Sequence, residues 1–361
     1  MKQKTITVFL WKDLKHPYAG GSIVYAFNQA EHWIKQGYRV IFLCPRFKGS
    51  KKYEKINGCH VFRSGGKFSN YITLPYLYLT KFKKHTDYIL DVENGTPYFT
   101  PLFSNKPKAM LLLHVHKDVV FKELPFYLAW MPYFAEVYLM PIIYRNTPLV
   151  AISKSTKKGF EKLGFKSKNF TLSYCGFDQK SAKPKTKFKN PTILYLGRIE
   201  KYKRIQLLIE MFEKLNYPNS ELIIAGGGRY LPEIKKRVKN SPLKNRIKIL
   251  GKVSEEEKFN LYAKSWIYAS ASSAEGWGIT VIEANACNTP AVSFNTAGLN
   301  ESIQHKTNGL IANTKSEFIT NMKKILDKKI KFPKLKEYAS QFTWENSAKK
   351  TLEALTKQLH K

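Results

Sequence analysis

The feature that constrains the fold most is a strand, a glycine loop and a helix within residues 266–287. A short, apolar, β-prone run over 266–270 precedes Gly276 and Gly278. From Ile279 onward, apolar residues recur at helical spacing, which predicts a helix. A glycine loop that leads into a helix presents free backbone N–H groups and a positive dipole end to an anion. The stretch therefore predicts a phosphate-binding turn.

Two acids belong to the same stretch: Glu275 precedes the glycines and Glu283 lies about one helical turn after them. Ionised carboxylates accept paired hydrogen bonds from vicinal hydroxyls, so both acids suit a sugar. In the alternative, Glu275 only caps the helix and Glu283 lies on a solvated face. The E-x7-E spacing before an alanine-rich helix resembles the signature of retaining GT-B glycosyltransferases. The resemblance implies a nucleotide-sugar donor, with Glu283 on the ribose and Glu275 on the transferred sugar.

The chain carries 61 Lys and Arg against 27 Asp and Glu, a net charge of +34 that is spread over both halves. Such a charge favours polyanionic partners, namely nucleic acid, anionic lipid or phosphorylated substrates. A lysine-rich composition with solvated faces is the simpler alternative. No helix-turn-helix, finger or aromatic RNA motif accompanies the charge, so we expect no specific nucleic acid partner. A basic nucleic-acid-binding protein stays the alternative from another class.

Length and cysteine usage indicate a two-domain protein of a reducing compartment. At 361 residues the chain can build two full cores. Its four cysteines are widely separated and form no C-x-x-C, which favours buried thiols. The N-terminus leads into a predicted strand without a signal-peptide pattern. We expect a cytoplasmic location, with peripheral contact with the inner face of an anionic membrane as a further hypothesis.

The first half alternates β-prone runs with helical patterns, which predicts a parallel sheet covered on both faces. Gly20 and Gly21 separate a strand over 6–11 from a helix over 22–36 that Ser22 would cap. An ordinary strand-to-helix loop is the alternative for this glycine pair. In the resembling glycosyltransferases a glycine loop at this place faces the donor phosphates and the acceptor.

Two histidines follow another β-prone run, predicted over residues 109–116. Alternation along a strand would project His114 and His116 to the same side. They could be a metal pair, but no third ligand stands at recognisable spacing and no D-x-D occurs, so we expect no metal. The resemblance implies that one of them lies against the donor sugar. His114 is favoured and His116 is the second choice, because many relatives carry another histidine where this chain has Leu113.

Residues 121–144 are the most aromatic and apolar part of the chain. Pro125, Pro132, Pro141 and Glu136 exclude a clean transmembrane helix. The segment is either core packing, which we favour, or an interfacial segment among lipid headgroups that the surrounding lysines help to bind.

A polar, lysine-rich stretch over 181–191 predicts a linker between an N-terminal domain, 1–180, and a C-terminal domain, 192–342. The second domain repeats the alternation of strands and helices. Each domain is thus expected to be Rossmann-like, and the two would face each other across a cleft. The GT-B architecture implies that the last segment, 343–361, is a helix that returns to the first domain.

Further motifs follow in the second domain. Arg198 and Lys203, five apart after its first strand, can converge on one diphosphate, although two solvated cations are the alternative. Gly226 and Gly227 end a predicted strand and would let a nucleotide lie against bare backbone. This domain resembles the same glycosyltransferases in the order of its motifs, namely G-R-x4-K, a glycine triplet, E-x7-E and a last glycine loop. In that last loop Asn300 replaces the usual proline. The implied donor contacts in addition include the backbone near Val253 and the helix start at Gly278, Ile279 and Thr280.

The sequence therefore predicts an α/β protein of GT-B architecture. The implied function is a retaining, metal-independent hexosyltransferase with His114 and Glu275 as catalytic residues. It would move a hexose from a UDP- or GDP-linked sugar to a glycan, lipid-linked or phosphate-bearing acceptor in cell-surface polysaccharide or glycolipid synthesis. An epimerase or phosphorylase on a similar scaffold is the closer alternative.

Overall fold

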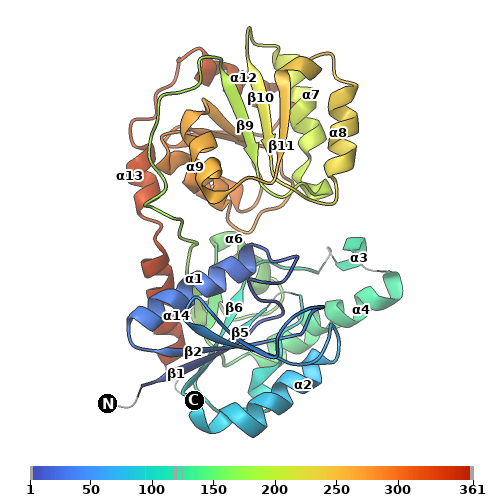
Figure 1. Cartoon of the computed structure of the whole chain (residues 1–361), viewed down its shortest axis with the longest axis vertical. Coiled ribbons are helices and arrows are strands. Elements are labelled where there is room, and N and C mark those ends of the chain that lie inside the picture. The colour runs from blue at the N-terminus through green and yellow to red at the C-terminus, as the bar shows by residue number, and fades with distance from the viewer. Residues whose placement is uncertain (1–2, 94, 118–119, 124, 358–361) are drawn as a thin grey trace. The chain divides into compact units, whose positions relative to one another are not determined.

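The computed structural model describes residues 3–93, 95–117, 120–123 and 125–357. It divides into two compact units (Figure 1). The first contains the chain up to Cys175 together with the chain from Trp344 onward, and the second contains Gly176–Thr343. Each unit is built on one sheet of its own.

The sheet of the first unit has eight strands in the order β3-β4-β2-β1-β5-β6-β7-β8. Seven of them are parallel, and β3, which the sequence analysis missed, pairs antiparallel with β4 at the edge. Every residue of β1 is buried, as expected for a parallel strand that is covered on both faces. The strands are β1 (Thr5–Phe9), β2 (Arg39–Cys44), β3 (Tyr53–Ile56), β4 (Cys59–Arg63), β5 (Tyr88–Val92), β6 (Lys108–Leu112), β7 (Leu149–Ala151) and β8 (Phe170–Leu172).

Helical segments connect these strands. The α-helices are α1 (Gly21–Lys35), α2 (Asn70–Leu77), α3 (Val120–Glu123), α4 (Phe126–Phe134), α5 (Met140–Ile143) and α6 (Lys154–Glu161). The 3₁₀- and π-helical segments are η1 (Tyr78–Phe82), η2 (Lys83–His85), η3 (Thr100–Leu102), η4 (Ala135–Leu139) and η5 (Ser167–Asn169). Helix α1 begins one residue earlier than predicted, with Gly20 at its N-cap and no side-chain capping bond, so the predicted Ser22 cap is wrong.

The last helix, α14 (Trp344–Thr356), packs on α1 in the first unit. The indole Nε1 of Trp33 donates to the carbonyl of Ala348 at 2.9 Å. The amide of Gln29 donates to the hydroxyls of Ser347 and Thr351, both at 2.9 Å. These buried polar groups fix the helix in one register, since each would be left unpaired by a shift.

The second unit contains a parallel six-stranded sheet in the order β11-β10-β9-β12-β13-β14. Its strands are β9 (Thr192–Leu196), β10 (Glu221–Ala225), β11 (Ile247–Gly251), β12 (Ile267–Ser270), β13 (Ala291–Phe294) and β14 (Gly309–Ala312). Its helical segments are η6 (Lys201–Lys203), α7 (Ile205–Leu215), α8 (Leu231–Lys239), η7 (Lys244–Arg246), α9 (Glu255–Lys264), α10 (Ile279–Ala286), α11 (Leu299–Ser302), α12 (Lys315–Leu326) and α13 (Leu335–Ser340).

Residues 181–191, expected to be a linker, belong to this second unit. The backbone N–H of Phe188 donates to the carbonyl of Lys264 at 2.8 Å, and the indole of Trp266 donates to the carbonyl of Phe188 at 2.9 Å. The polar composition gave no sign of these contacts, because the residues that Phe188 meets are distant in the sequence.

The aromatic segment forms one continuous helical stretch over Phe126–Ile143, made of α4, η4 and α5. Among the described residues it alone is a helix long and apolar enough to cross a membrane, with a mean hydropathy of 1.2 and 22% of its residues buried. The favoured interpretation as core packing is therefore wrong for most of its side chains. Those exposed by at least half are Phe126, Tyr127, Trp130, Met131, Phe134, Tyr138 and Ile142, which we call the aromatic face.

Backbone crowding requires glycine at two of the three positions that follow β10. A Cβ on Gly226 would lie 1.8 Å from the carbonyl oxygen of Gly197, and Gly226 has a φ of +135°. A Cβ on Gly228 would lie 2.1 Å from the carbonyl oxygen of Ile199. The loops after β9 and β10 thus touch backbone to backbone, and only glycine permits this approach.

We predict that Gly226→Ala lowers the free energy of unfolding of the second unit by about 2–3 kcal/mol, because alanine at this φ also meets a carbonyl oxygen. Gly21→Ala is the matched control, since a Cβ on Gly21 meets no heavy atom within 4 Å. It should change the stability of the first unit by less than about 0.5 kcal/mol. Amide hydrogen exchange in β9, β10 and α1 measures the stability change of each variant. Equal losses of stability in the two variants would contradict the conclusion that backbone crowding requires glycine at position 226.

Candidate active site

The loops at the carboxyl edge of the second sheet are joined to one another by specific contacts. Both the backbone N–H and the hydroxyl of Ser273, after β12, donate to the carbonyl of Tyr202, after β9, at 2.9 and 3.0 Å. The guanidinium of Arg204 donates to the carbonyls of Ala271 and Ser272 at 2.7 and 3.2 Å. These bonds hold the loop after β9 against the loop before α10, so side chains from both loops are fixed relative to one another.

This junction brings Lys203 and Glu275 together. The ammonium of Lys203 forms a short ion pair with the carboxylate of Glu275, and both side chains are more than four-fifths buried. Arg198, in the same loop, donates from Nη2 to the hydroxyl of Tyr202 at 3.0 Å, and it is exposed. Two of the predicted donor cations therefore lie in one loop, beside the acid predicted to bind the sugar.

The second acid, Glu283, lies in the first turns of α10 and is nearly fully buried. Its carboxylate accepts from the ammonium of Lys258 at 2.9 Å and from the hydroxyl of Tyr262 at 3.1 Å, both on α9. Burial raises the pKa of the Glu283 carboxyl, and Lys258 opposes that shift. The solvated alternative for Glu283 is therefore wrong. Its expected contact with a ribose is untested.

Helix α10 begins where the glycine loop predicts it. Gly278 is its N-cap, with a φ of +82° and no side-chain capping bond. The hydroxyl of Thr280 is hydrogen-bonded to that of Tyr268 at 2.7 Å, while Ile279 starts the helix. The backbone N–H groups of this first turn are thus not capped by a side chain, which is the arrangement that binds anions. Val253, predicted beside the base, lies in the loop after β11.

The remaining predicted residues belong to the first unit. Gly20 and Gly21 open helix α1, and a Cβ on either would meet open space. Strand β6 ends at Leu112, so the predicted strand through His116 is wrong. The carbonyl of Leu113 bonds instead to the hydroxyl of Thr156 at 3.0 Å. His114 is exposed in the loop that follows, and its ring lies 3.9 Å from that of His116.

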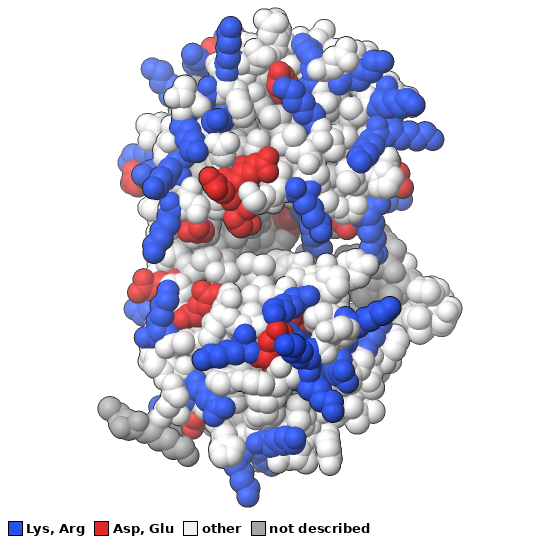
Figure 2. Space-filling model, viewed as in Figure 1, with Lys and Arg blue, Asp and Glu red and all other residues white. Residues whose placement is uncertain are grey.

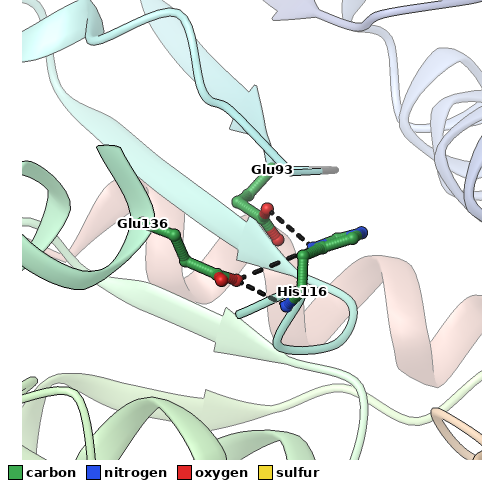
Figure 3. A group of neighbouring side chains, drawn as sticks. All are labelled: Glu93, His116 and Glu136. Atoms are coloured by element: carbon green, nitrogen blue, oxygen red, sulfur yellow. Dashed lines mark hydrogen bonds and ion pairs between the residues drawn. The ribbon is translucent and has the colours of Figure 1, made fainter. Parts of the chain in front are cut away.

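His116 points toward two buried acids, Glu93 after β5 and Glu136 in η4 (Figure 3). Its Nδ1 lies 3.3 Å from Oε1 of Glu93 and 3.7 Å from Oε1 of Glu136, whose Oε1 also accepts from the backbone N–H of His116 at 2.7 Å. Burial alone would lower the pKa of His116, but the two carboxylates raise it to about 10. The one ligand atom that each residue offers lies within 4.8 Å of the others, so the group could hold a metal ion.

Sequence reasoning missed several residues of these sites. Arg204, Lys258 and Tyr262 were not singled out, because nothing in their spacing links them to the residues that they contact. The search for a third metal ligand beside the histidines missed Glu93 and Glu136, which come from other elements. An acid inside an apolar aromatic helix, as at Glu136, was the available signal, because a buried acid requires a partner.

Lys and Arg side chains spread over the visible faces of both units, with the acids in smaller groups (Figure 2). On the face that Figure 2 shows, basic side chains of both units thus contribute to the net charge of +34. Anionic substrates and lipids are attracted to such a surface.

The chain is similar to known proteins in two ways. The family model described as "Glycosyl transferases group 1" matches residues 177–342. Mannosylfructose-phosphate synthase of Agrobacterium fabrum is 28% identical over 194 residues, which cover 47% of this chain and 43% of that protein. The matching part of the chain thus spans less than half the length of its curated relatives.

The fold likeness extends over nearly the whole chain. Sucrose-phosphate synthase of Thermosynechococcus elongatus gives a TM-score of 0.81 at 18% identity, covering 97% of this chain and 98% of that one. HepE of Anabaena, solved with UDP-glucose, gives 0.77 at 17% identity, covering 98% and 99%. Residues 177–342 thus match the model of the glycosyl transferases group 1 family, and the likeness to solved structures shows that the chain has the GT-B fold.

Proposed function

We propose that this protein is a retaining glycosyltransferase that moves a hexose from a UDP- or GDP-linked donor to a glycan, lipid-linked or phosphate-bearing acceptor. The observation that carries the proposal is the junction at the edge of the second sheet. There Arg198, Lys203, Glu275 and the uncapped start of α10 come from two loops that are bonded to each other. UDP-glucose in the HepE structure supports a nucleotide-sugar donor.

The diphosphate would be stabilised by fixed positive charge. When the nucleoside diphosphate leaves, negative charge develops on its phosphate oxygens. The guanidinium of Arg198, the ammonium of Lys203 and the first-turn N–H groups of α10 supply donors that need no rearrangement at that moment. We propose that this set takes the place of a divalent ion on the diphosphate.

Each of the two acids would bind a different sugar of the donor. Each oxygen of the Glu283 carboxylate has one protein donor, and a carboxylate has about four acceptor sites, so it can still accept from a ribose diol. Glu275 is held by Lys203 and retains free acceptor sites for hydroxyls of the transferred hexose. In the first unit, we propose His114 as a residue that contacts a sugar.

We propose that the acceptor is reached at the aromatic face of the first unit. Its side chains are exposed, and exposed aromatic rings on a protein with a net charge of +34 suit the headgroup region of an anionic membrane. An acceptor that is lipid-linked would be reached at that surface. The protein would then be cytoplasmic and peripheral on the inner face of the membrane.

We predict that Lys203→Ala lowers kcat for hexose transfer by about 10²–10³-fold, because it removes one donor from the developing phosphate charge. Thermal stabilisation by the cognate donor should also weaken in this variant. Lys201→Ala is the matched control: Lys201 is exposed in the same short helix, and its loss should change the rate less than about twofold.

The donor for this assay is found by thermal shift with a panel of UDP-, GDP- and ADP-sugars. Transfer or slow hydrolysis with retained anomeric configuration supports the proposal. Interconversion of the sugar without its release would assign an epimerase, and phosphate-dependent cleavage would assign a phosphorylase. Unchanged transfer by Lys203→Ala would remove Lys203 from the site.

We further predict that replacing Trp130, Met131 and Phe134 together with serine weakens binding to anionic liposomes at low salt by at least about tenfold. Each of these side chains contributes about 1 kcal/mol or more when it leaves water. Co-sedimentation with vesicles measures the effect.

The control for this test replaces Ile72 and Tyr76, two equally exposed side chains of α2, with serine. These changes should leave liposome binding within about twofold. If the wild-type protein does not bind anionic vesicles at low salt, the membrane proposal fails. If both variants lose binding alike, the aromatic face is not the contact.

A further inference from the structure

The buried group of Glu93, His116 and Glu136 contains more acceptor atoms than the protein satisfies (Figure 3). Within the part of the chain that the structure describes, Oε2 of Glu93, Oε2 of Glu136 and Nδ1 of His116 have no hydrogen-bond partner. Both carboxylates are at least 99% buried as side chains. A buried polar atom without a partner is costly, so three of them in one place require an explanation.

A proton on His116 explains only part of this arrangement. An imidazolium offers one positive charge to two carboxylates, and its Nδ1 lies 3.3 and 3.7 Å from them without forming an aligned hydrogen bond. The ion pairs of Glu93 and Glu136 with described residues are all with this histidine. One negative charge and both Oε2 atoms would remain uncompensated. A water molecule could donate hydrogen bonds to these oxygens, but it would not neutralise the remaining negative charge.

The spacing of the three side chains fits a small divalent ion. With metal–ligand bonds of about 2.1 Å, two ligands in a tetrahedral site lie about 3.4 Å apart. Nδ1 lies 3.3 Å from Oε1 of Glu93 and 3.7 Å from Oε1 of Glu136, and one ligand atom of each residue lies within 4.8 Å of the others. A divalent ion bound to Nδ1 and to one oxygen of each carboxylate would balance both negative charges. Imidazole with carboxylates is a donor set for zinc-like transition metals, whereas calcium and magnesium prefer oxygen alone.

We propose that Glu93, His116 and Glu136 form a binding site for one divalent transition-metal ion such as Zn²⁺. The three ligands come from the end of β5, the loop after β6 and the helical stretch that bears the aromatic face. The ion would therefore tie these elements together. Three protein ligands leave a fourth position for water or for an oxygen of a bound molecule.

This site goes beyond the proposed transfer reaction and does not depend on it. The cations proposed for the diphosphate, Arg198 and Lys203, belong to the second unit, whereas all three metal ligands belong to the first. With Nδ1 of His116 on the ion, His114 is the histidine left for a sugar, in agreement with the choice made from the sequence.

The test measures metal binding by the full-length protein, with no assay of transfer. Protein stripped with a chelator and dialysed is titrated with Zn²⁺ by calorimetry, and metal content is measured after gel filtration. We expect one equivalent with a dissociation constant below about 1 µM, and a raised thermal midpoint. Co²⁺ in place of Zn²⁺ should give the strong visible absorption of a four-coordinate site.

Three variants localise the ion. Glu136→Gln and Glu93→Gln keep the side-chain shape but remove one ligand charge, so each should weaken Zn²⁺ binding by at least about 100-fold. Glu256→Gln, an exposed acid on α9, should bind as the wild type does. The proposal is overturned if the wild-type chain holds no ion at micromolar Zn²⁺. It is also overturned if both variants bind as well as Glu256→Gln, or if Co²⁺ gives only the weak spectrum of a hydrated ion.

Discussion

The backbone contact between two loops at the carboxyl edge of the second sheet determines where the proposed donor-binding side chains of that unit lie. The carbonyl oxygens of Gly197 and Ile199 occupy the space that side chains at Gly226 and Gly228 would need. Close packing here fixes the loop that carries Arg198 and Lys203. Arg204 and Ser273 then join this loop to the one that carries Glu275. A rigid set of donors costs no reorganisation when charge develops, which is why this packing matters for the proposed chemistry.

Much of the second unit follows from its sequence because strands, glycine loops and helices alternate at regular spacing. In strands β9, β10 and β13 and in helix α7, the apolar run ends where a glycine or a polar residue follows. The glycine triplet was recognised as a loop, and its expected contact with a nucleotide is untested. No local pattern tells whether a glycine makes room for a ligand or for a neighbouring loop, because that depends on which strand lies alongside.

The first unit was harder to derive because its functional features depend on distant residues. Asp91, in β5, is fully buried and accepts hydrogen bonds from the backbone of Tyr98 and Thr100 and from the hydroxyl of Tyr144. The aromatic helix has the composition of a core segment, and only the three-dimensional structure shows that its apolar face is exposed. Glu136 is the exception within that helix, and its burial beside His116 connects the aromatic face to the histidine loop.

The central claim is that cations and helix N–H groups of the second unit stabilise the diphosphate of the donor. The most direct measurement is a crystal structure with a bound nucleoside diphosphate. The account predicts phosphate oxygens about 2.7–3.2 Å from the guanidinium of Arg198, the ammonium of Lys203 and the first-turn N–H groups of α10. A diphosphate held through a metal ion, or bound away from these residues, would contradict it.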